Sequence, residues 1–189
     1  MGDKAARPGR PRDPRADAAI LQAARDLMAE GGLSNLTVEG TAQRAGVAKT
    51  TVYRRYPTKL TLAVAAVAAL ISPEEPYGEN LEDVVGNGLA QFTGDFASSD
   101  GQSAFLSVAA AASGDGVAHA LFTSQVLGPI EEKLQRSLGL AGASASSFAF
   151  DVLMGTMIHR LVIRQLPLDD DFEGRFVELT RFVTDGDAP

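Results

Sequence analysis

Apolar residues recur every three or four positions along most of the chain, which is the spacing of one face of an α-helix. No stretch alternates between apolar and polar residues as a half-buried strand would. Helices are expected over residues 13–31, 38–45, 49–56, 58–71, 81–96, 103–113, 117–138, 144–165 and 172–183. The pattern therefore predicts an all-α fold with about nine helices.

Local signals indicate where these helices begin and end. Asp13 and Pro14 form a typical helix start, because Asp accepts from exposed amides and proline fits the first turn. Thr37 is expected to cap the second helix in the same way. The third helix should stop before Pro57, since the residue preceding a proline disfavours the helical region. Within 117–138, Pro129 should either kink the helix or split it.

Charge is distributed unevenly along the 189 residues, although the net charge is -7. Residues 1–60 hold 11 Lys/Arg against 6 Asp/Glu, a net charge of +5, whereas residues 61–189 hold 6 against 18, a net charge of -12. This asymmetry favours phosphate contact by the first third, while phosphates would be repelled by the rest. A solvated basic tail without a target is the alternative interpretation.

Several function classes are disfavoured by composition. The absence of cysteine excludes a disulfide scaffold and thiolate chemistry, and two histidines are too few to favour a zinc site. The longest apolar run, residues 62–71, is too short to span a bilayer, and no apolar segment of a secretory signal follows the basic N-terminus. No nucleophile motif, phosphate-binding glycine loop or metal-ligand spacing is present. We expect a cytoplasmic protein that is not an enzyme and needs no cofactor.

Residues 38–56 fit a helix-turn-helix. Ala42 is small where two helices would approach, Gly46 suits a tight turn, and Val47 and Val52 are apolar anchors. A helix anchored through Val52 presents outward Lys49, Thr50, Tyr53 and Arg54. Such side chains suit a major groove, because Lys and Arg donate to guanine and Thr and Tyr meet a methyl group or a phosphate. A solvated helical hairpin is the alternative.

The stretch LTVEGTAQRAGVAKTTVYRRYPTKL, residues 36–60, resembles the DNA-binding domain of TetR/AcrR-type transcriptional regulators. The matching segments are TVE, AGV, VYR and YPTK, together with Lys49. The sequence departs from the family at Gly40, usually a polar helix former, and at Thr41, usually an aliphatic anchor. These departures put the stability of the second helix in question, since glycine costs about 1 kcal/mol inside a helix.

The resemblance implies a role for each residue that would face DNA. Phosphates would be held by Thr37, Tyr53, Tyr56 and Lys59, and base edges would be faced by Lys49, Thr50, Thr51 and Arg54. The proline-rich arm that carries Arg7, Arg10 and Arg12 resembles arms that enter the minor groove. A plain disordered tail explains the arm equally well.

The C-terminal part resembles the family less specifically. Residues 155–161 followed by 166–170 are similar to the last two helices of one C-terminal subfamily, which form a four-helix dimer interface. The interface residues expected from this are Phe150, Leu153, Met157, Leu161, Phe176 and Leu179. Residues expected to line an effector pocket are Phe92, Phe96, Phe105, His119 and Phe122. Core packing within one chain is the alternative for both sets.

The predicted organisation is a flexible basic arm (1–12), a three-helix helix-turn-helix DNA-binding domain (13–60) and a larger helical domain for ligand binding and dimerisation (61–189). The resemblance implies a homodimeric repressor, released from a palindromic operator in double-stranded DNA by an unknown small-molecule effector. A dimer is also expected physically, because one short recognition helix makes few contacts. The alternative is an architectural protein that binds DNA without sequence preference.

Overall fold

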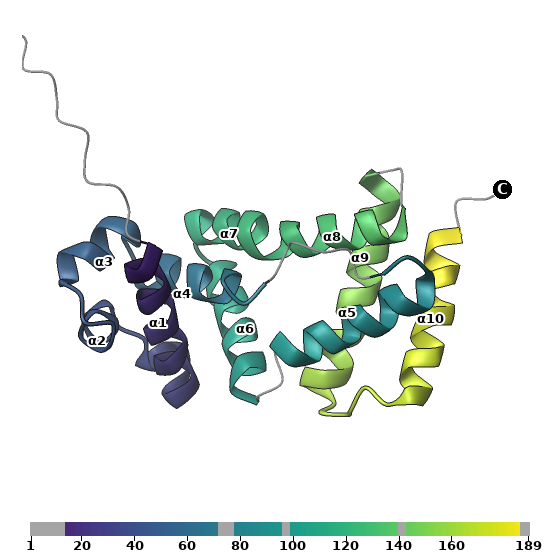
Figure 1. The fold of residues 1–189 in the computed structure, drawn as a ribbon, viewed down its shortest axis with the longest axis horizontal. Coiled ribbons are helices and arrows are strands. Elements are labelled where there is room, and N and C mark those ends of the chain that lie inside the picture. Colours follow the sequence, from purple (N-terminus) through teal and green to yellow (C-terminus); the bar gives the residue numbers. More distant parts are fainter. Residues whose placement is uncertain (1–13, 72–77, 96–98, 140–142, 186–189) are drawn as a thin grey trace, which may run out of the picture.

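The computed structural model describes residues 14–71, 78–95, 99–139 and 143–185. These residues form helices and connecting turns, with no strand among them, so the predicted all-α fold is confirmed (Figure 1). The α-helices are α1 (Pro14–Asn35), α2 (Val38–Arg44), α3 (Lys49–Arg55), α4 (Lys59–Ala68), α5 (Leu81–Asp95), α6 (Ser99–Ala112), α7 (Gly116–Phe122), α8 (Gly128–Leu138), α9 (Ala143–Ile158) and α10 (Asp170–Asp185). Within the described ranges, no helix is both long and apolar enough to cross a membrane.

Pro129 splits one expected helix in two. α7 ends at Phe122 and is followed by η1 (Thr123–Leu127), a π-helical turn that leads directly into α8. Pro129 lies in the first turn of α8, and its nitrogen has no hydrogen to donate to the carbonyls of η1. The widened turn before it accommodates the proline ring, which would crowd the carbonyl one turn earlier in a regular helix. A second π-helical turn, η2 (His159–Ile163), ends α9 without any proline.

The first three helices form a compact N-terminal unit. α1 is interrupted at Gly31 and Gly32, as predicted, and the positive φ of Gly32 (67°) turns the chain. Beyond the break, the Asn35 side chain donates to the carbonyl of Leu27 at 2.9 Å. Leu36 then enters the core with no exposed surface. The break therefore lets the chain leave α1 and start α2 without leaving the last carbonyls unpaired.

The two departures from the family pattern in α2 are accommodated. Thr37 caps α2 by accepting from the Gly40 amide at 2.9 Å. A Cβ at Gly40 would lie 2.8 Å from that hydroxyl oxygen, so glycine leaves room for the cap. Thr41 is fully buried, but its hydroxyl donates to the Thr37 carbonyl at 2.8 Å. Its polar atom is satisfied, and only the apolar contacts of a larger side chain are given up.

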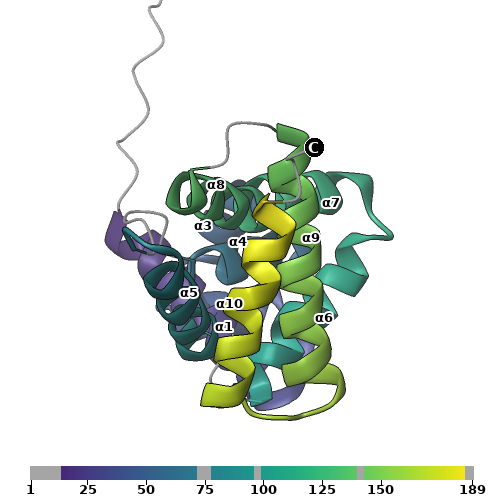
Figure 2. The ribbon, with the colours of Figure 1, turned by 90° about the vertical axis from the view of Figure 1, so that its right-hand side faces the viewer.

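α4 joins the N-terminal unit to the remaining helices. Thr58 and Thr61 form a reciprocal capping box at its start. α4 packs against α1 and also against α6, α7 and η1, and α1 itself packs against α6. Farther along the molecule, α5, α8, α9 and α10 pack together (Figure 1). α9 and α10 lie side by side and antiparallel at the end opposite α2 and α3 (Figure 2).

The turn between α2 and α3 depends on Gly46, whose φ is +66°. Gly46→Ala should lower the free energy of unfolding by about 1 kcal/mol, because L-residues other than glycine are strained there. Urea denaturation measures the change. Gly94→Ala is the matched control, since Gly94 lies in α5 with open space at its Cβ position. The control should raise stability by about 0.5 kcal/mol, and a Gly46→Ala protein as stable as the parent would contradict the strain.

Candidate functional site

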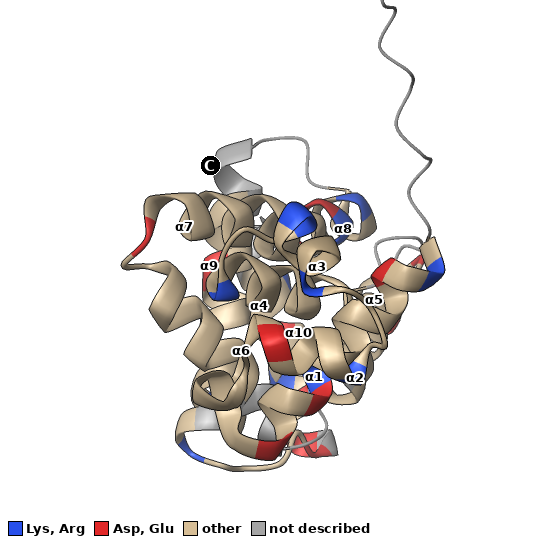
Figure 3. Ribbon diagram, turned by 90° about the vertical axis from the view of Figure 1, so that its left-hand side faces the viewer, with Lys and Arg blue, Asp and Glu red and all other residues tan. Residues whose placement is uncertain are grey.

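α3 presents one polar face outward from the N-terminal unit. Val52 is fully buried and Ala42 of α2 is 2% exposed, so the two helices meet through these residues. The opposite side of α3 carries exposed Lys49, Thr50, Tyr53 and Arg54, while Thr51 is half-buried. Figure 3 looks onto this end of the molecule, with the ribbon of α3 coloured blue at its basic residues. This exposed face has the size and composition of a helix that enters a major groove.

Ion pairs behind this face attach α2 and α3 to α1. Arg55 of α3 is 13% exposed, and its guanidinium lies 2.8 Å from the Asp17 carboxylate of α1. Arg44, at the end of α2, makes two bonds to the Glu30 carboxylate, at 2.6 and 3.1 Å. The Arg44 pKa is raised above its usual value, chiefly by this hydrogen bonding. Each contact joins residues that are at least 14 positions apart in the sequence, so the two contacts constrain the angles at which α2 and α3 pack on α1.

Glu39 of α2 organises two side chains of the outward face. Its Oε1 lies 3.7 Å from the Lys49 ammonium and accepts from the Tyr53 hydroxyl at 3.3 Å. The Glu39 pKa is lowered, first by a bond from its own backbone amide and then by Lys49 and Tyr53. The Tyr53 pKa is raised, mainly by the neighbouring Glu39 charge. The carboxylate orients Lys49 and Tyr53 towards the same region, where a phosphate would compete with it.

The remaining residues expected at phosphates border this face. Thr37 is exposed, and because its oxygen caps α2, its hydroxyl hydrogen is left to donate outward. Tyr56 and Lys59 are half-buried, and the Lys59 ammonium donates to the Ser34 carbonyl at 3.2 Å. The structure thus brings the predicted residues of α2, α3 and the start of α4 together on one end. Arg7, Arg10 and Arg12 lie outside the described residues.

A largely apolar cavity that opens to solvent lies among α5, α8, α9 and α10, and its empty space is about 690 Å³ when the open solvent at its mouth is counted. Its wall is formed by Ile71, Val84, Val85, Gly88, Leu89, Gln91, Phe92, Ile130, Leu134, Phe150, Leu153, Met154, Met157, Phe176 and Thr180. A concave apolar wall with a few polar groups is typical of a small-molecule site. This cavity is therefore the candidate ligand site in the described part of the chain.

The expected pocket residues divide between this wall and other places. Phe92 is the expected residue that lines this cavity. Phe105 and Phe122 do not, because they pack against each other between α6 and α7, with ring centroids 5.5 Å apart. His119 is exposed on α7 and is not among the residues that line this cavity. Phe96 lies outside the described residues.

Four residues expected at a dimer interface are instead buried within their own chain. Phe150, Leu153, Met157 and Phe176 are 4–7% exposed and line the cavity, so they have little area left for a partner. Leu161 and Leu179 are half-buried and pack against the core. Among the side chains of α9 and α10 that the structure describes, the exposed large apolar ones are Phe148 of α9 (61%) and Phe182 of α10 (77%). Sequence periodicity missed both, because apolar residues surround most of α9.

Comparison with known proteins agrees with the geometry of the N-terminal unit. The model for bacterial regulatory proteins of the tetR family matches residues 20–66, which run from the middle of α1 into α4. A curated relative, the uncharacterized HTH-type transcriptional regulator YdeS of Bacillus subtilis (strain 168), is 35% identical over 89 residues. That match covers 44% of this chain and 45% of the relative. The chain thus spans less than half of the length of this relative.

Solved structures extend the likeness over most of the chain. The TetR family transcription regulator SCO0332 is 26% identical with a TM-score of 0.66, covering 93% of this chain and 100% of that one. Residues 20–66 thus match the TetR family model, and the chain as a whole has the fold of TetR-family regulators. A TetR transcriptional regulator from Rhodococcus sp. RHA1 is 19% identical with a TM-score of 0.68, over 92% of this chain and 98% of that one. The predicted family and architecture are confirmed.

The environment of Glu39 can be measured directly. We expect the Glu39 carboxyl to titrate below the ordinary glutamate range, followed by NMR of its side-chain carbon. Because a lowered pKa stabilises the folded state above the unfolded-state pKa, this contribution is present at neutral pH and is lost as the pH falls through the folded-state pKa. Lys49→Ala should raise the midpoint of the Glu39 titration, but not as far as the ordinary glutamate value, because the bond from the backbone amide remains. Arg54→Ala is the control and should leave it unchanged; equal shifts in both variants would contradict the pairing.

Proposed function

We propose that this protein is a homodimeric, sequence-specific DNA-binding transcription regulator, and that a small molecule in the cavity releases it from a palindromic operator. The observation that carries the proposal is the outward face of α3, which is anchored from behind by Val52 and Arg55. Lys49 and Arg54 would meet base edges, while Tyr53 and Thr37 would hold phosphates. The proposed role is repression, in which the protein bound at its operator would block the promoter.

A dimer is supported by the surface of α9 and α10. Phe148 lies near the start of α9 and Phe182 near the end of α10, so both lie at the same end of this antiparallel pair (Figure 2). Gly155 of α9 is exposed with open space beside it, which would allow another helix to approach closely. Two copies joined here would present two α3 helices to successive turns of DNA.

The cavity is connected to the N-terminal unit by helices that pack against one another in turn. α8 contributes Ile130 and Leu134 to the cavity wall and continues through η1 into α7. α7 and η1 both pack against α4, which packs against α1. A ligand that prefers a shifted position of α8 would therefore favour a shifted α4 and a different spacing of the two α3 helices. The ligand would weaken DNA binding by an amount set by the difference between its affinities for the two states.

Architectural binding without sequence preference is the second candidate, and the charge distribution disfavours it. Residues 61–189 carry a net charge of -12, so a wrapped DNA would be repelled by most of the protein. DNA contact is confined to the N-terminal end, as expected for reading a short site.

The double variant Lys49→Ala, Arg54→Ala tests the DNA-binding proposal. Each lost base contact should cost about 1–3 kcal/mol of binding free energy at the cognate site and much less on scrambled DNA. Electrophoretic mobility shift at fixed salt, with the DNA upstream of the protein's own gene, measures both. Arg136→Ala removes one charge from an exposed site on α8 and should leave operator affinity unchanged. Equal losses on operator and scrambled DNA would favour the architectural reading.

The double variant Phe148→Asp, Phe182→Asp tests the dimer surface. Two charges placed on this face would be desolvated in an interface, so the protein should become monomeric and lose operator affinity. Sedimentation equilibrium gives the mass. Val117→Asp is the matched control, because Val117 is 67% exposed on α7, away from α9 and α10. A double variant that remains dimeric would place the interface elsewhere.

A further inference from the structure

The wall of the cavity is electrically neutral in the part of the chain that the structure describes. Among the described residues that line it, none is acidic, basic or a histidine. Its polar side chains are Gln91 of α5 and Thr180 of α10, and the remaining residues are apolar or glycine. A bound molecule would therefore be surrounded mainly by hydrocarbon groups.

Both polar side chains of the wall have partners within the protein. The Thr180 hydroxyl is fully buried and donates to the Phe176 carbonyl at 2.7 Å. The Gln91 Oε1 accepts from the Lys133 ammonium of α8 at 2.7 Å. A ligand that used these groups would have to replace bonds that already hold them. A polar contact at this wall would therefore add little net affinity, because one hydrogen bond would be exchanged for another.

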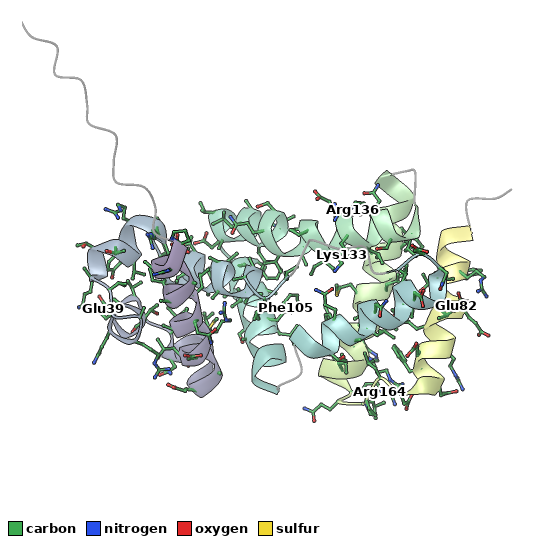
Figure 4. All side chains as sticks on the ribbon, viewed as in Figure 1. Glu39, Glu82, Phe105, Lys133, Arg136 and Arg164 are labelled. Atoms are coloured by element: carbon green, nitrogen blue, oxygen red, sulfur yellow. The ribbon has the colours of Figure 1, made fainter. Side chains whose placement is uncertain are left out.

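The charge of Lys133 is used between two helices. Lys133 is 6% exposed, and its side chain lies between α8 and α5 (Figure 4). It is not among the residues that line the cavity. A ligand carboxylate would have to disturb its bond to Gln91 in order to pair with it, and a ligand ammonium would be repelled. Either charged group would lose its hydration without an ion-pair partner on the described wall, which is strongly unfavourable.

Apolar contacts are available from all four helices around the cavity. They include Phe92 of α5, Leu134 of α8, Met154 and Met157 of α9, and Phe176 of α10. Burial of apolar surface is the favourable contribution that such a wall offers, and it grows with the apolar area of the ligand. The two thioether side chains adapt to irregular shapes. The wall therefore selects for apolar character more strongly than for one exact outline.

We propose that this cavity binds an uncharged, apolar molecule, held by contact with the side chains of α5, α8, α9 and α10 and without an ion pair. The inference rests on the proposed function for its biological meaning, because it makes such a molecule the effector. Since α8 continues through η1 into α7, contact with α8 is how the ligand would act on the N-terminal unit. Binding is measurable without DNA, so the two proposals can fail separately.

The test compares methyl esters, carboxylates and primary amines that carry the same straight chain of about six to ten carbons. Isothermal calorimetry and the shift in Tm measure binding of each probe to the full chain at neutral pH. We expect each ester to bind about tenfold more tightly than the carboxylate or the ammonium of the same length. Ester affinity should rise about fourfold for each added CH₂ until the cavity is filled.

A pair of variants at Met154 places the binding in the cavity. Met154 is half-buried and lines the wall, so Met154→Gln adds an amide of similar length there and should weaken ester binding about fivefold. Met154→Leu is the matched control, because it keeps an apolar side chain and should leave ester affinity within about twofold. Thermal melting followed by circular dichroism shows whether each variant folds. The comparison of head groups on the parent chain decides the ligand class without either variant.

Three results would each overturn the ligand class: a carboxylate or an amine that binds as tightly as its ester, an ester affinity that a folded Met154→Gln protein retains in full, or no binding of any probe. Ester binding that is weakened by Met154→Gln and kept by Met154→Leu would support it. Ester binding that leaves operator affinity unchanged would keep the ligand class and overturn its role as effector.

Discussion

The burial of α4 on nearly all sides is the constraint on which the rest of this structure depends. Six of its ten residues are buried, and Leu62, Ala63 and Val64 have no exposed surface. Alanine and valine are small enough for α1, α6 and α7 all to pack closely against it. A helix enclosed in this way cannot move without displacing its neighbours, because a packed core tolerates little empty space. The N-terminal unit and the C-terminal helices therefore share one core.

The two candidate sites differ in how they are held. The α3 face is fixed to α1 by charged contacts at its edge, through Arg55 and Asp17 and through Arg44 and Glu30. The cavity is bounded by apolar side chains, including those of Met154 and Met157, which adapt to ligand shape more readily than branched residues. A rigid face suits selection of one DNA sequence, whereas an adaptable wall suits a response to a bound molecule. α4, α7 and η1 lie between the two.

Buried polar groups at the cavity are hydrogen-bonded, as they are in α2. Thr41 and Thr180 are both buried, and each hydroxyl returns to a carbonyl of its own helix or cap. Lys133 is directed to Gln91 instead, across the gap between α8 and α5. A buried ammonium is costly unless polar groups solvate it, so the bond from Lys133 to Gln91 helps to hold α8 against α5.

Sequence by itself determined the N-terminal unit, because its signals act within one turn of helix. Thr37 capped α2, Gly46 adopted the positive φ of the turn, and the third helix ended before Pro57. Tertiary structure alone decided which apolar residues of α9 and α10 face the cavity and which face outward. Apolar residues surround most of α9, so periodicity could not separate Phe150 from Phe148, and the pairing of Lys133 with Gln91 joins residues 42 positions apart. Such choices depend on where neighbouring helices pack, and that information is not local.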